Sequence, residues 1–355
     1  MNNITVIGID LAKNVFQVYA EDKEENKIYN RRMKRAQFIK WIEKLSPCVV
    51  GMEACGTAHY WGRVFSEKGH RVKLMNPKKV KVFVDRNKND AKDAEAIAEA
   101  TRSKKVLSIP IKTLAQQVLT SIHRARSQVV RQRTEVANHL RSQLAEYGVI
   151  TTTGHAALEH LAQRVLGGEV LEADEGLLFM VSDLYETLKN LKKRLSDYDA
   201  KIKRIAKENK SACKLMTMPG IGEITATALV AKVEDFSSFK RGCNFAAWLG
   251  LTPKEYSSAG KRKLGGISKQ GDRYLRTLLI HGARAVIQAV LKKKRDETSY
   301  HRWIVGLVER RGKNNAAVAL ANKHARMIWA IMKHGRCVDL DFAASFQESS
   351  LQEAT

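Results

Sequence analysis

Four carboxylate side chains in the first hundred residues have the type and placement that divalent-metal chemistry requires: Asp10, Glu53, Asp90 and Asp93. Asp10 follows the apolar run ITVIGI, and Glu53 follows the apolar run VVGM, so both are expected at the ends of buried strands. Buried acids are unfavourable without a positive partner, and convergent carboxylates are a common cage for Mg²⁺. Two such ions, about 3.5–4 Å apart, serve phosphodiester cleavage by activating the nucleophile and stabilising the leaving oxygen.

Asp90 and Asp93 open the stretch NDAKDAEAIAEA, which predicts the start of a helix. Their spacing of three places them on one helix face. Acids are also favoured in a first helical turn by the helix dipole alone, so a purely structural role stays open for this pair. Three nearby acids compete for the same assignment: Asp85, Glu95 and Glu99.

A second candidate group lies in a basic, serine-containing segment between Lys240 and Arg276. This segment holds nine Lys or Arg residues against two acids, so it suits a phosphate backbone. A serine here, Ser257 or Ser258, could attack phosphorus if a base or nearby cations stabilised its alkoxide. From the chemistry of these residue types alone, a solvated basic loop is the favoured interpretation over a serine nucleophile. The cations that we expect to contact nucleic acid are Lys261, Arg262, Lys263, Lys269 and Arg273.

The third motif is PGIG at residues 219–222, followed by the apolar stretch EITATALVA. Gly220 and Gly222 permit a tight turn and a close approach of the backbone to a phosphate. The following helix would present free amides to that anion, as in a helix-hairpin-helix. The alternative is a glycine turn between two packed helices.

The acids of the N-terminal region would be positioned by an α/β domain. Apolar and alternating runs predict strands at residues 4–10, 15–20, 27–33, 49–53 and 70–75, with helices at 36–45, 59–68 and from residue 90. This order matches a ribonuclease H-like (RuvC-like) domain. The order alone does not separate that fold from other α/β arrangements, whereas the positions of the acids do.

The middle of the chain is predicted to be a long helical arm. Residues 115–136 show helical spacing, and residues 177–208 carry a heptad seam. The seam residues are Val181, Leu184, Leu188, Leu191, Leu195, Tyr198, Ile202 and Ile205. Two long antiparallel helices are expected, with a coiled-coil seam and a smaller tip between them. The seam serves either a hairpin within the chain or a dimerisation arm, and both interpretations stay open.

The composition favours a polyanionic partner. The 355 residues carry a formal net charge of +25, which favours nucleic acid and makes a membrane surface the second choice, without an anchor to support it. No apolar run approaches the ~20 residues that span a bilayer, and no targeting segment is expected. The five cysteines show no CxxC pair, so reduced thiols in a cytoplasmic protein are expected.

Together these blocks resemble the RuvC-type "DEDD" transposases and invertases of the insertion-sequence-110 family, with their Piv/MooV relatives. At the N-terminus the resemblance rests on IGIDLAKNVFQV, GMEACGTAHYW and NDAKDAEAIAEA. At the C-terminus it rests on MPGIGEITATALVAKVEDFSSF, FAAWLGLTPKEYSSAGKRKLGGISKQGDRYLR and AVALANKHARMIWAIMK. The resemblance covers nearly the whole chain.

The resemblance implies a DNA recombinase with a split active site. Asp10, Glu53, Asp90 and Asp93 would hold Mg²⁺, and a serine of SSAG would form a covalent link to DNA. The family has a serine followed by glycine, so Ser258 aligns best, but Ala259 stands in the glycine position and Ser257 remains an alternative. The resemblance also implies a homo-oligomer, dimer or tetramer, and a noncoding bridge RNA that selects the DNA.

The expected organisation is a RuvC-like catalytic domain at 1–110, a helical coiled-coil arm at 111–210, a mostly α-helical serine transposase domain with a helix-hairpin-helix at 211–337, and a tail at 338–355. Two other functions remain in competition. A two-metal, junction-resolving nuclease would use the acids without serine chemistry. A non-catalytic nucleic-acid-binding protein would need neither group.

Overall fold

A computed structural model describes residues 4–84, 89–152, 154–233, 235–258, 260–261, 263–292 and 298–335. The chain divides into two compact units, Met1–Leu114 and Ala115–Thr355. Within the described ranges, no helix combines the length and the apolar character needed to cross a bilayer. The predicted three-domain division remains a prediction, and the predicted tail at 338–355 lies outside the described residues.

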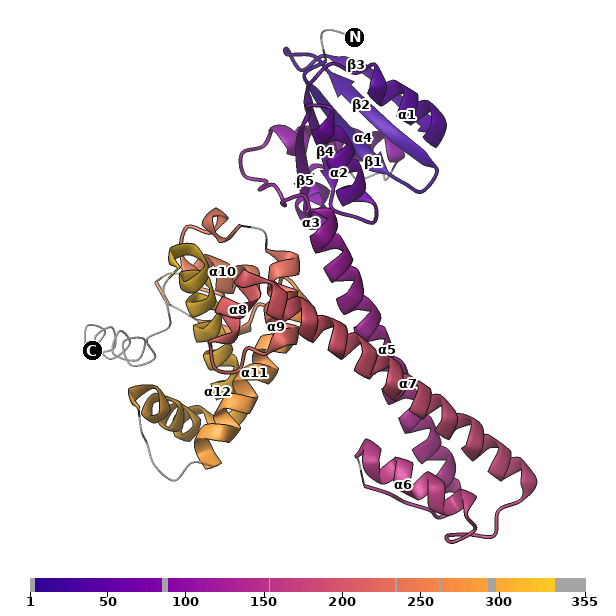
Figure 1. Cartoon of the computed structure of the whole chain (residues 1–355). Helices are drawn as coiled ribbons and strands as arrows, with labels where there is room; N and C mark the ends of the chain where they lie inside the picture. Colours follow the sequence, from indigo (N-terminus) through magenta and orange to yellow (C-terminus); the bar gives the residue numbers. More distant parts are fainter. Residues whose placement is uncertain are drawn as a thin grey trace. The chain divides into compact units, whose positions relative to one another are not determined.

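The first unit is built on a five-stranded mixed sheet with the order β3-β2-β1-β4-β5 (Figure 1). The strands are β1 (Val6–Leu11), β2 (Val15–Glu21), β3 (Lys27–Lys34), β4 (Val49–Glu53) and β5 (Arg71–Met75). The first three form an antiparallel meander, whereas β1, β4 and β5 run parallel. Parallel strands bring their carboxyl ends to one edge, which is where a site can be assembled.

Helices cover both faces of this sheet. The helices of the first unit are α1 (Arg35–Glu43), α2 (Ala58–Glu67), α3 (Pro77–Val80) and α4 (Asp90–Arg102), with a 3-10 turn η1 (Lys81–Phe83). Ile7 and Ile9 point toward a core with aromatic residues of α1 and α2, in which Phe16 and Phe38 stack at 4.3 Å. Because side chains alternate along a strand, Gly8 faces the opposite side, where α4 lies.

The predicted strands and helices of this unit are confirmed to within a few residues. The sequence prediction missed α3 and η1, because a short helical connection carries too little periodicity to be recognised. The mixed α/β character and the strand order are compatible with the predicted RuvC-like domain.

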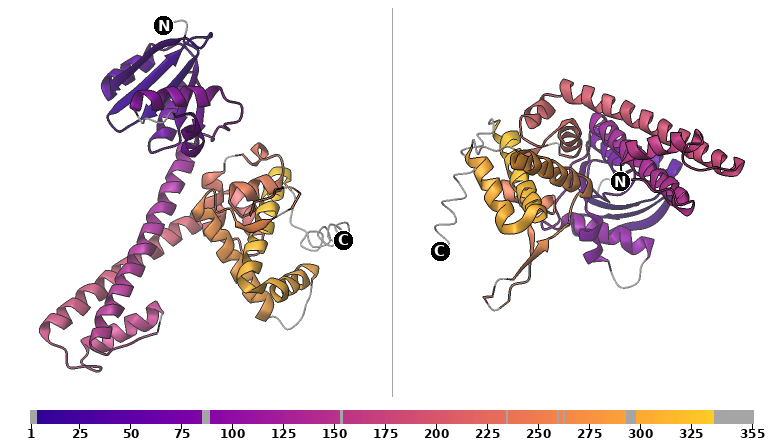
Figure 2. Two further views of the ribbon diagram at one scale, coloured as in Figure 1. Left: turned by 180° about the vertical axis from the view of Figure 1, so that it is seen from behind. Right: turned by 90° about the horizontal axis from the view of Figure 1, so that it is seen from below.

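The second unit begins with two long helices, α5 (Leu114–Glu146) and α7 (Glu175–Glu208), joined by α6 (His155–Leu166). Their contacts show that the two long helices are antiparallel. Val129 of α5 shares a cluster with Leu191 and Leu195 of α7, whereas Leu144 shares one with Leu177 and Val181. The predicted antiparallel pair is therefore confirmed, and α5 and α7 lie side by side in the left view of Figure 2.

The predicted seam is largely buried within the chain. Val181, Leu188, Leu191, Leu195 and Ile202 are at most 8% exposed. The seam thus has partners on α5 and α6 of the same chain, which is the hairpin interpretation. A role of the arm in dimerisation remains a prediction, as does a coiled coil in the strict sense.

Helices α8 to α12 form a second core. The remaining elements are α8 (Lys210–Met216), α9 (Glu223–Lys232), η2 (Phe236–Ser238), α10 (Gly242–Trp248), β6 (Pro253–Glu255), β7 (Leu264–Ile267), α11 (Arg273–Lys292) and α12 (Ser299–His334). Their apolar faces share one large buried cluster. The chain within α12 breaks at Gly312, where φ is +73°. The predominance of helices matches the prediction, apart from the small β6–β7 hairpin.

Candidate active site

The parallel pair β1 and β4 places two of the predicted acids side by side. Ile9 pairs with Met52 across these strands, so Asp10 and Glu53 come next at the carboxyl ends. Both acids lie two residues beyond a glycine, Gly8 or Gly51, and therefore share that glycine's face of the sheet.

The two glycines allow α4 to lie very close to that face. A Cβ on Gly8 would be 2.2 Å from the carbonyl oxygen of Ala94, and one on Gly51 would be 1.7 Å from Oγ1 of Thr101. Any side chain at these positions would therefore push α4 away from the sheet. Glycine inside a strand often marks such a close approach. The two strand glycines are visible in the sequence and are the signal that could have predicted this close approach.

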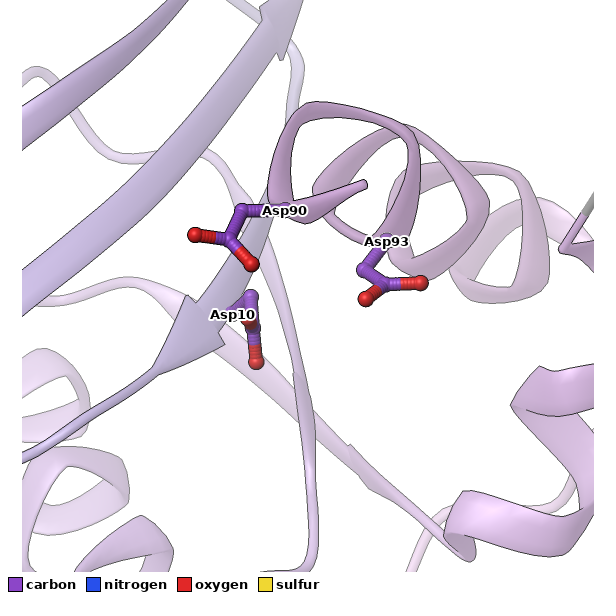
Figure 3. Close-up of side chains that lie close together, drawn as sticks. All are labelled: Asp10, Asp90 and Asp93. Atoms are coloured by element: carbon purple, nitrogen blue, oxygen red, sulfur yellow. The ribbon is translucent and has the colours of Figure 1, made fainter. Parts of the chain in front are cut away.

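The close packing of α4 brings its first turn over the end of β1. Asn89 caps the helix by accepting a hydrogen bond from the amide of Ala91. Oxygens of Asp10, Asp90 and Asp93 all lie within 4.8 Å of one another. Figure 3 shows Asp10 on its strand and the two other acids on the facing helix, with all three carboxyl groups around a common space. The structure therefore unites three of the four predicted acids.

Glu53 lies near this group of three but is not part of it. Burial raises the pKa of the Cys55 thiol, and the charges of Glu53 and Asp10 raise it further. Both carboxylates therefore act on one thiol at the same edge of the sheet. Cys55 itself was not predicted as a neighbour of the site.

The two competing acids that the structure describes do not join this group. Glu95 and Glu99 are exposed on α4 and are not members of the three-residue cluster, and Asp85 lies outside the described residues. Asp90 is exposed, whereas Asp10 and Asp93 are half-buried. The geometry favours Asp90 and Asp93 over Glu95 and Glu99, and it leaves Asp85 untested.

Amide side chains tie the first turn of α4 to the sheet. Asn30 of β3 donates a hydrogen bond to the carbonyl of Ala91 at 2.8 Å and accepts one from Gln17 at 2.6 Å. Gln17 in turn pairs with Asp10 across β1 and β2. The sequence analysis missed these residues because their role depends on strand register.

The far end of α4 is held by Lys73. Its ammonium group donates to the carbonyl groups of Thr101 and Ser103, each at 2.8 Å, and to that of Ala100 at 3.3 Å. Burial lowers the pKa of Lys73, and the charge of Arg71 acts in the same direction. A cation at the C-terminus of a helix also interacts favourably with the helix dipole. Both ends of α4 are thus fixed to the sheet.

This group of acids has the chemistry of a divalent-metal site. Its donors are all carboxylate oxygens, which Mg²⁺ and Mn²⁺ prefer over nitrogen or sulfur ligands. Two of the donors come from one helical turn and one from a strand, so the backbone sets their separation. The arrangement can hold one or two ions against a phosphodiester.

The predicted serines lie on the β6–β7 hairpin of the second unit, which projects from the helices in the right view of Figure 2. The hydroxyl of Ser257 donates to Oε1 of Glu255 at 2.7 Å. The backbone of Ser258 accepts a hydrogen bond from the amide of Lys261 at 3.0 Å. Both serines are exposed. Ser257 is thus hydrogen-bonded to a carboxylate, and the sequence had not identified Glu255 as its partner.

The predicted nucleic-acid contacts of this unit are mostly exposed. Lys261, Lys263 and Lys269 are open to solvent around the hairpin, and Arg273 is exposed at the start of α11. Arg262 and Ala259 lie outside the described residues. These positions are compatible with backbone contacts, which remain predictions.

The PGIG turn joins α8 to α9, and its two glycines have different surroundings. Gly220 has φ +78°, and a Cβ there would be 2.7 Å from the carbonyl oxygen of Gly282 on α11. A Cβ on Gly222 would meet nothing within 4 Å. Close packing against α11 therefore accounts for Gly220, whereas the backbone at Gly222 is open. The predicted phosphate contact of either glycine remains untested.

Comparisons with known proteins find mainly transposases, and also a gene-inverting protein. The model of the transposase IS116/IS110/IS902 family matches residues 212–300, and a second model, described as a transposase, matches residues 7–149. A probable family 20 transposase of Pseudomonas aeruginosa is 43% identical over 336 residues, covering 94% of this chain and 98% of the relative.

Two further relatives differ in how similar they are. The transposase of the insertion sequence element IS1111A from Coxiella burnetii is 39% identical, over 94% of this chain and 90% of its own length. The pilin gene-inverting protein of Moraxella bovis is only 22% identical, over 94% and 98% respectively. The candidate acids and serines all lie within the stretches matched by the two family models.

Proposed function

The chain belongs to the IS116/IS110/IS902 family of transposases, and we propose that it moves a DNA element by cutting and rejoining strands through a covalent serine–DNA intermediate. The observation that carries the proposal is the cluster of Asp10, Asp90 and Asp93 at the carboxyl edge of a mixed sheet. Family membership supplies DNA as the substrate.

The acids would hold Mg²⁺, with Glu53 completing the set from the neighbouring strand. A bound Mg²⁺ would supply Lewis-acid stabilisation of the charge that develops on phosphate oxygens. The chain's own contribution is positional. The contacts of α4 with Gly8, Gly51, Asn30 and Lys73 keep the carboxylates at one place on the sheet edge.

A serine hydroxyl of the hairpin would attack phosphorus and form a serine–phosphate ester, while the displaced DNA oxygen leaves with a proton. Ser258 is favoured by the family pattern, in which a serine precedes glycine. Ser257 is favoured by its hydrogen bond to Glu255, a carboxylate placed to accept the hydroxyl proton. The exposed cations Lys261 and Lys263 would attract the DNA backbone to either residue.

The proposal extends to partners. A noncoding bridge RNA would select the DNA sites, and the net charge of +25 provides the electrostatic attraction that two polyanions require. Because the acids and the serines lie on separate units, a homo-oligomer could combine them between chains. The enzyme would act in the cytoplasm, where its DNA substrate lies.

The test is trapping on labelled element-end DNA with Mg²⁺ and the RNA encoded beside the element. Wild type is compared with Ser257→Ala, Ser258→Ala and Asp10→Ala. A protein–DNA adduct that disappears in one serine variant identifies the nucleophile and supports the proposal. Cleavage without an adduct, retained in both serine variants and lost in Asp10→Ala, identifies a two-metal nuclease and refutes the serine step. If the wild type gives neither cleavage nor an adduct, and all three variants bind DNA as the wild type does, the chain is a non-catalytic nucleic-acid-binding protein.

A further inference from the structure

A cationic cleft of the second unit lies between α5, α9 and α11. Its volume is about 460 Å³. Four cations line it: Arg124, Arg131, Lys232 and Arg273. A second cavity, beside Gly220, measures about 350 Å³ and has a largely apolar lining, so it offers little to a charged ligand.

The charges of the cleft are strongly unbalanced. Asp272 is its one acidic lining residue, and its carboxylate already accepts hydrogen bonds from Lys232 at 2.9 Å and from the amide of Leu275. Burial acts to raise the pKa of Asp272, but these two donors outweigh it and leave the pKa lowered. Asp272 and Lys232 therefore neutralise each other, and the charges of Arg124, Arg131 and Arg273 are left over.

One wall of the cleft is a polar stripe along α5. Arg124, Ser127, Gln128 and Arg131 follow the spacing i, i+3, i+4, i+7, which places them on one helix face. Arg131 also contacts the side-chain oxygen of Gln128. At 1.5 Å per residue, the two arginines are separated by roughly 10 Å along the axis. That span exceeds a single phosphate and approximates three base steps of one nucleic-acid strand, at about 3.4 Å each.

Buried hydrogen bonds from α5 tie it to α9 and α11 around the cleft. Thr227 donates its hydroxyl proton to the carbonyl of Glu223, so it must accept from Nε2 of His123 at 3.1 Å. Nδ1 of the same ring then accepts from the hydroxyl of Tyr274, also at 3.1 Å. Burial lowers the pKa of His123 to about 4, helped by Arg126 and Lys232, so the ring is neutral at pH 7. Helices fixed to one another in this way offer a preorganised surface to a ligand.

We propose that this cleft binds the sugar–phosphate backbone of a nucleic-acid strand, with Arg124 and Arg131 each contacting a different phosphate. The proposal rests on the proposed function, because a transposase supplies the nucleic acid. It adds a binding site outside the acids, the serines and the basic hairpin. DNA and RNA share the recognised group, and the experiment separates them.

The test uses the full-length chain with Arg124→Ala and Arg131→Ala combined. The control combines Arg194→Ala and Lys201→Ala, which removes the same charge at the same spacing from the exposed face of α7. Binding to duplex DNA, to single-stranded DNA and to RNA of one sequence is measured between 50 and 400 mM salt. Far-UV circular dichroism confirms that both variants fold.

Loss of two phosphate contacts lowers the log–log salt slope by about 1.8 for duplex DNA and about 1.4 for a single strand. At 0.1 M salt a slope change of about 1.8 corresponds to a loss in affinity of roughly 60-fold. The probe whose slope falls identifies the strand held in the cleft. An unchanged slope for all three probes, or an equal fall in the control, overturns the inference.

The trapping experiment described above distinguishes a failure of the cleft inference from a failure of the proposed function. If the cleft variant binds nucleic acid like wild type while adduct formation still depends on a hairpin serine, the inference fails and the proposed function stands. If the slope falls as expected but no adduct forms in any variant, the cleft is a binding site and the serine step is wrong.

Discussion

Replacing Gly8 with alanine should separate the acids without touching any of them. The added Cβ would be 2.2 Å from the carbonyl oxygen of Ala94 and 2.5 Å from the amide nitrogen of Ala98, both on the backbone of α4. Backbone atoms cannot rotate away, so α4 must retreat by roughly 1 Å before these contacts become ordinary. Overpacking of this kind costs about 1–3 kcal/mol of stability.

The catalytic effect should exceed the effect on stability. A displacement of about 1 Å at a catalytic group can lower the rate by about 100-fold, and here it would move Asp90 and Asp93 together relative to Asp10. We expect weaker Mn²⁺ binding by electron paramagnetic resonance, with a loss of DNA cleavage of that order at a temperature where the variant is folded. Gly56→Ala is the matched control, because a Cβ there meets nothing within 4 Å.

The outcome that would refute this reasoning is clear. If Gly8→Ala binds Mn²⁺ and cleaves DNA like Gly56→Ala, close docking of α4 on β1 does not set the spacing of the acids. A loss of cleavage with unchanged metal binding would instead place the effect on the substrate. Either result would remove the link between the strand glycines and the metal site.

Three further predictions follow from the same contacts. Asn30→Ala removes the hydrogen bond to Ala91 and should weaken Mn²⁺ binding several-fold and lower the stability by about 1 kcal/mol. Asn30→Gln should restore part of the Mn²⁺ affinity and part of the stability, as measured by the same Mn²⁺ titration and by thermal unfolding. Leu188→Lys combined with Leu195→Lys buries charge between α5 and α7 and should unfold the helical arm, which circular dichroism would show as a loss of helicity. Phe179→Lys is the control, because this position is 76% exposed and the substitution should leave the helicity unchanged. His123 has a folded-state pKa below its unfolded value, so its contribution to stability is complete above about pH 6.5 and declines as the pH falls toward 4, by at most about 3 kcal/mol. His123→Gln should therefore flatten the pH dependence of unfolding between pH 6.5 and 4, and an unchanged slope would mean that the ring is not held neutral.

The sequence predicted the order of elements because their periodicities are strong and local. The alternating runs of β1 and β2 and the heptads of α7 each specify one buried face. The break of α12 at Gly312 was not predicted, since an isolated glycine in a helical pattern is often tolerated. The seam itself could not reveal its partner, because the same apolar spacing serves a hairpin within one chain and a contact between two.

The acids were predictable as types, and their grouping depended on tertiary contacts. A carboxylate after a buried strand and a pair in a first helical turn are visible in the sequence. The register that sets Asp10 beside Glu53, and the relay from Gln17 through Asn30 to α4, depend on pairings between segments far apart in the chain. The cleft beside Arg124 was not predicted for the same reason, since its walls come from three helices that are not consecutive in the chain.

The anchoring of α4 has a physical rationale in the acids that it carries. Three carboxylates within 4.8 Å repel one another, and because two lie on α4 and one on β1, the repulsion acts to lift the helix from the sheet. The contacts that oppose this force, at Gly8, Gly51, Asn30 and Lys73, use backbone proximity and hydrogen bonds to main-chain oxygens. The sheet therefore holds α4 in place by close packing and by hydrogen bonds to its main chain.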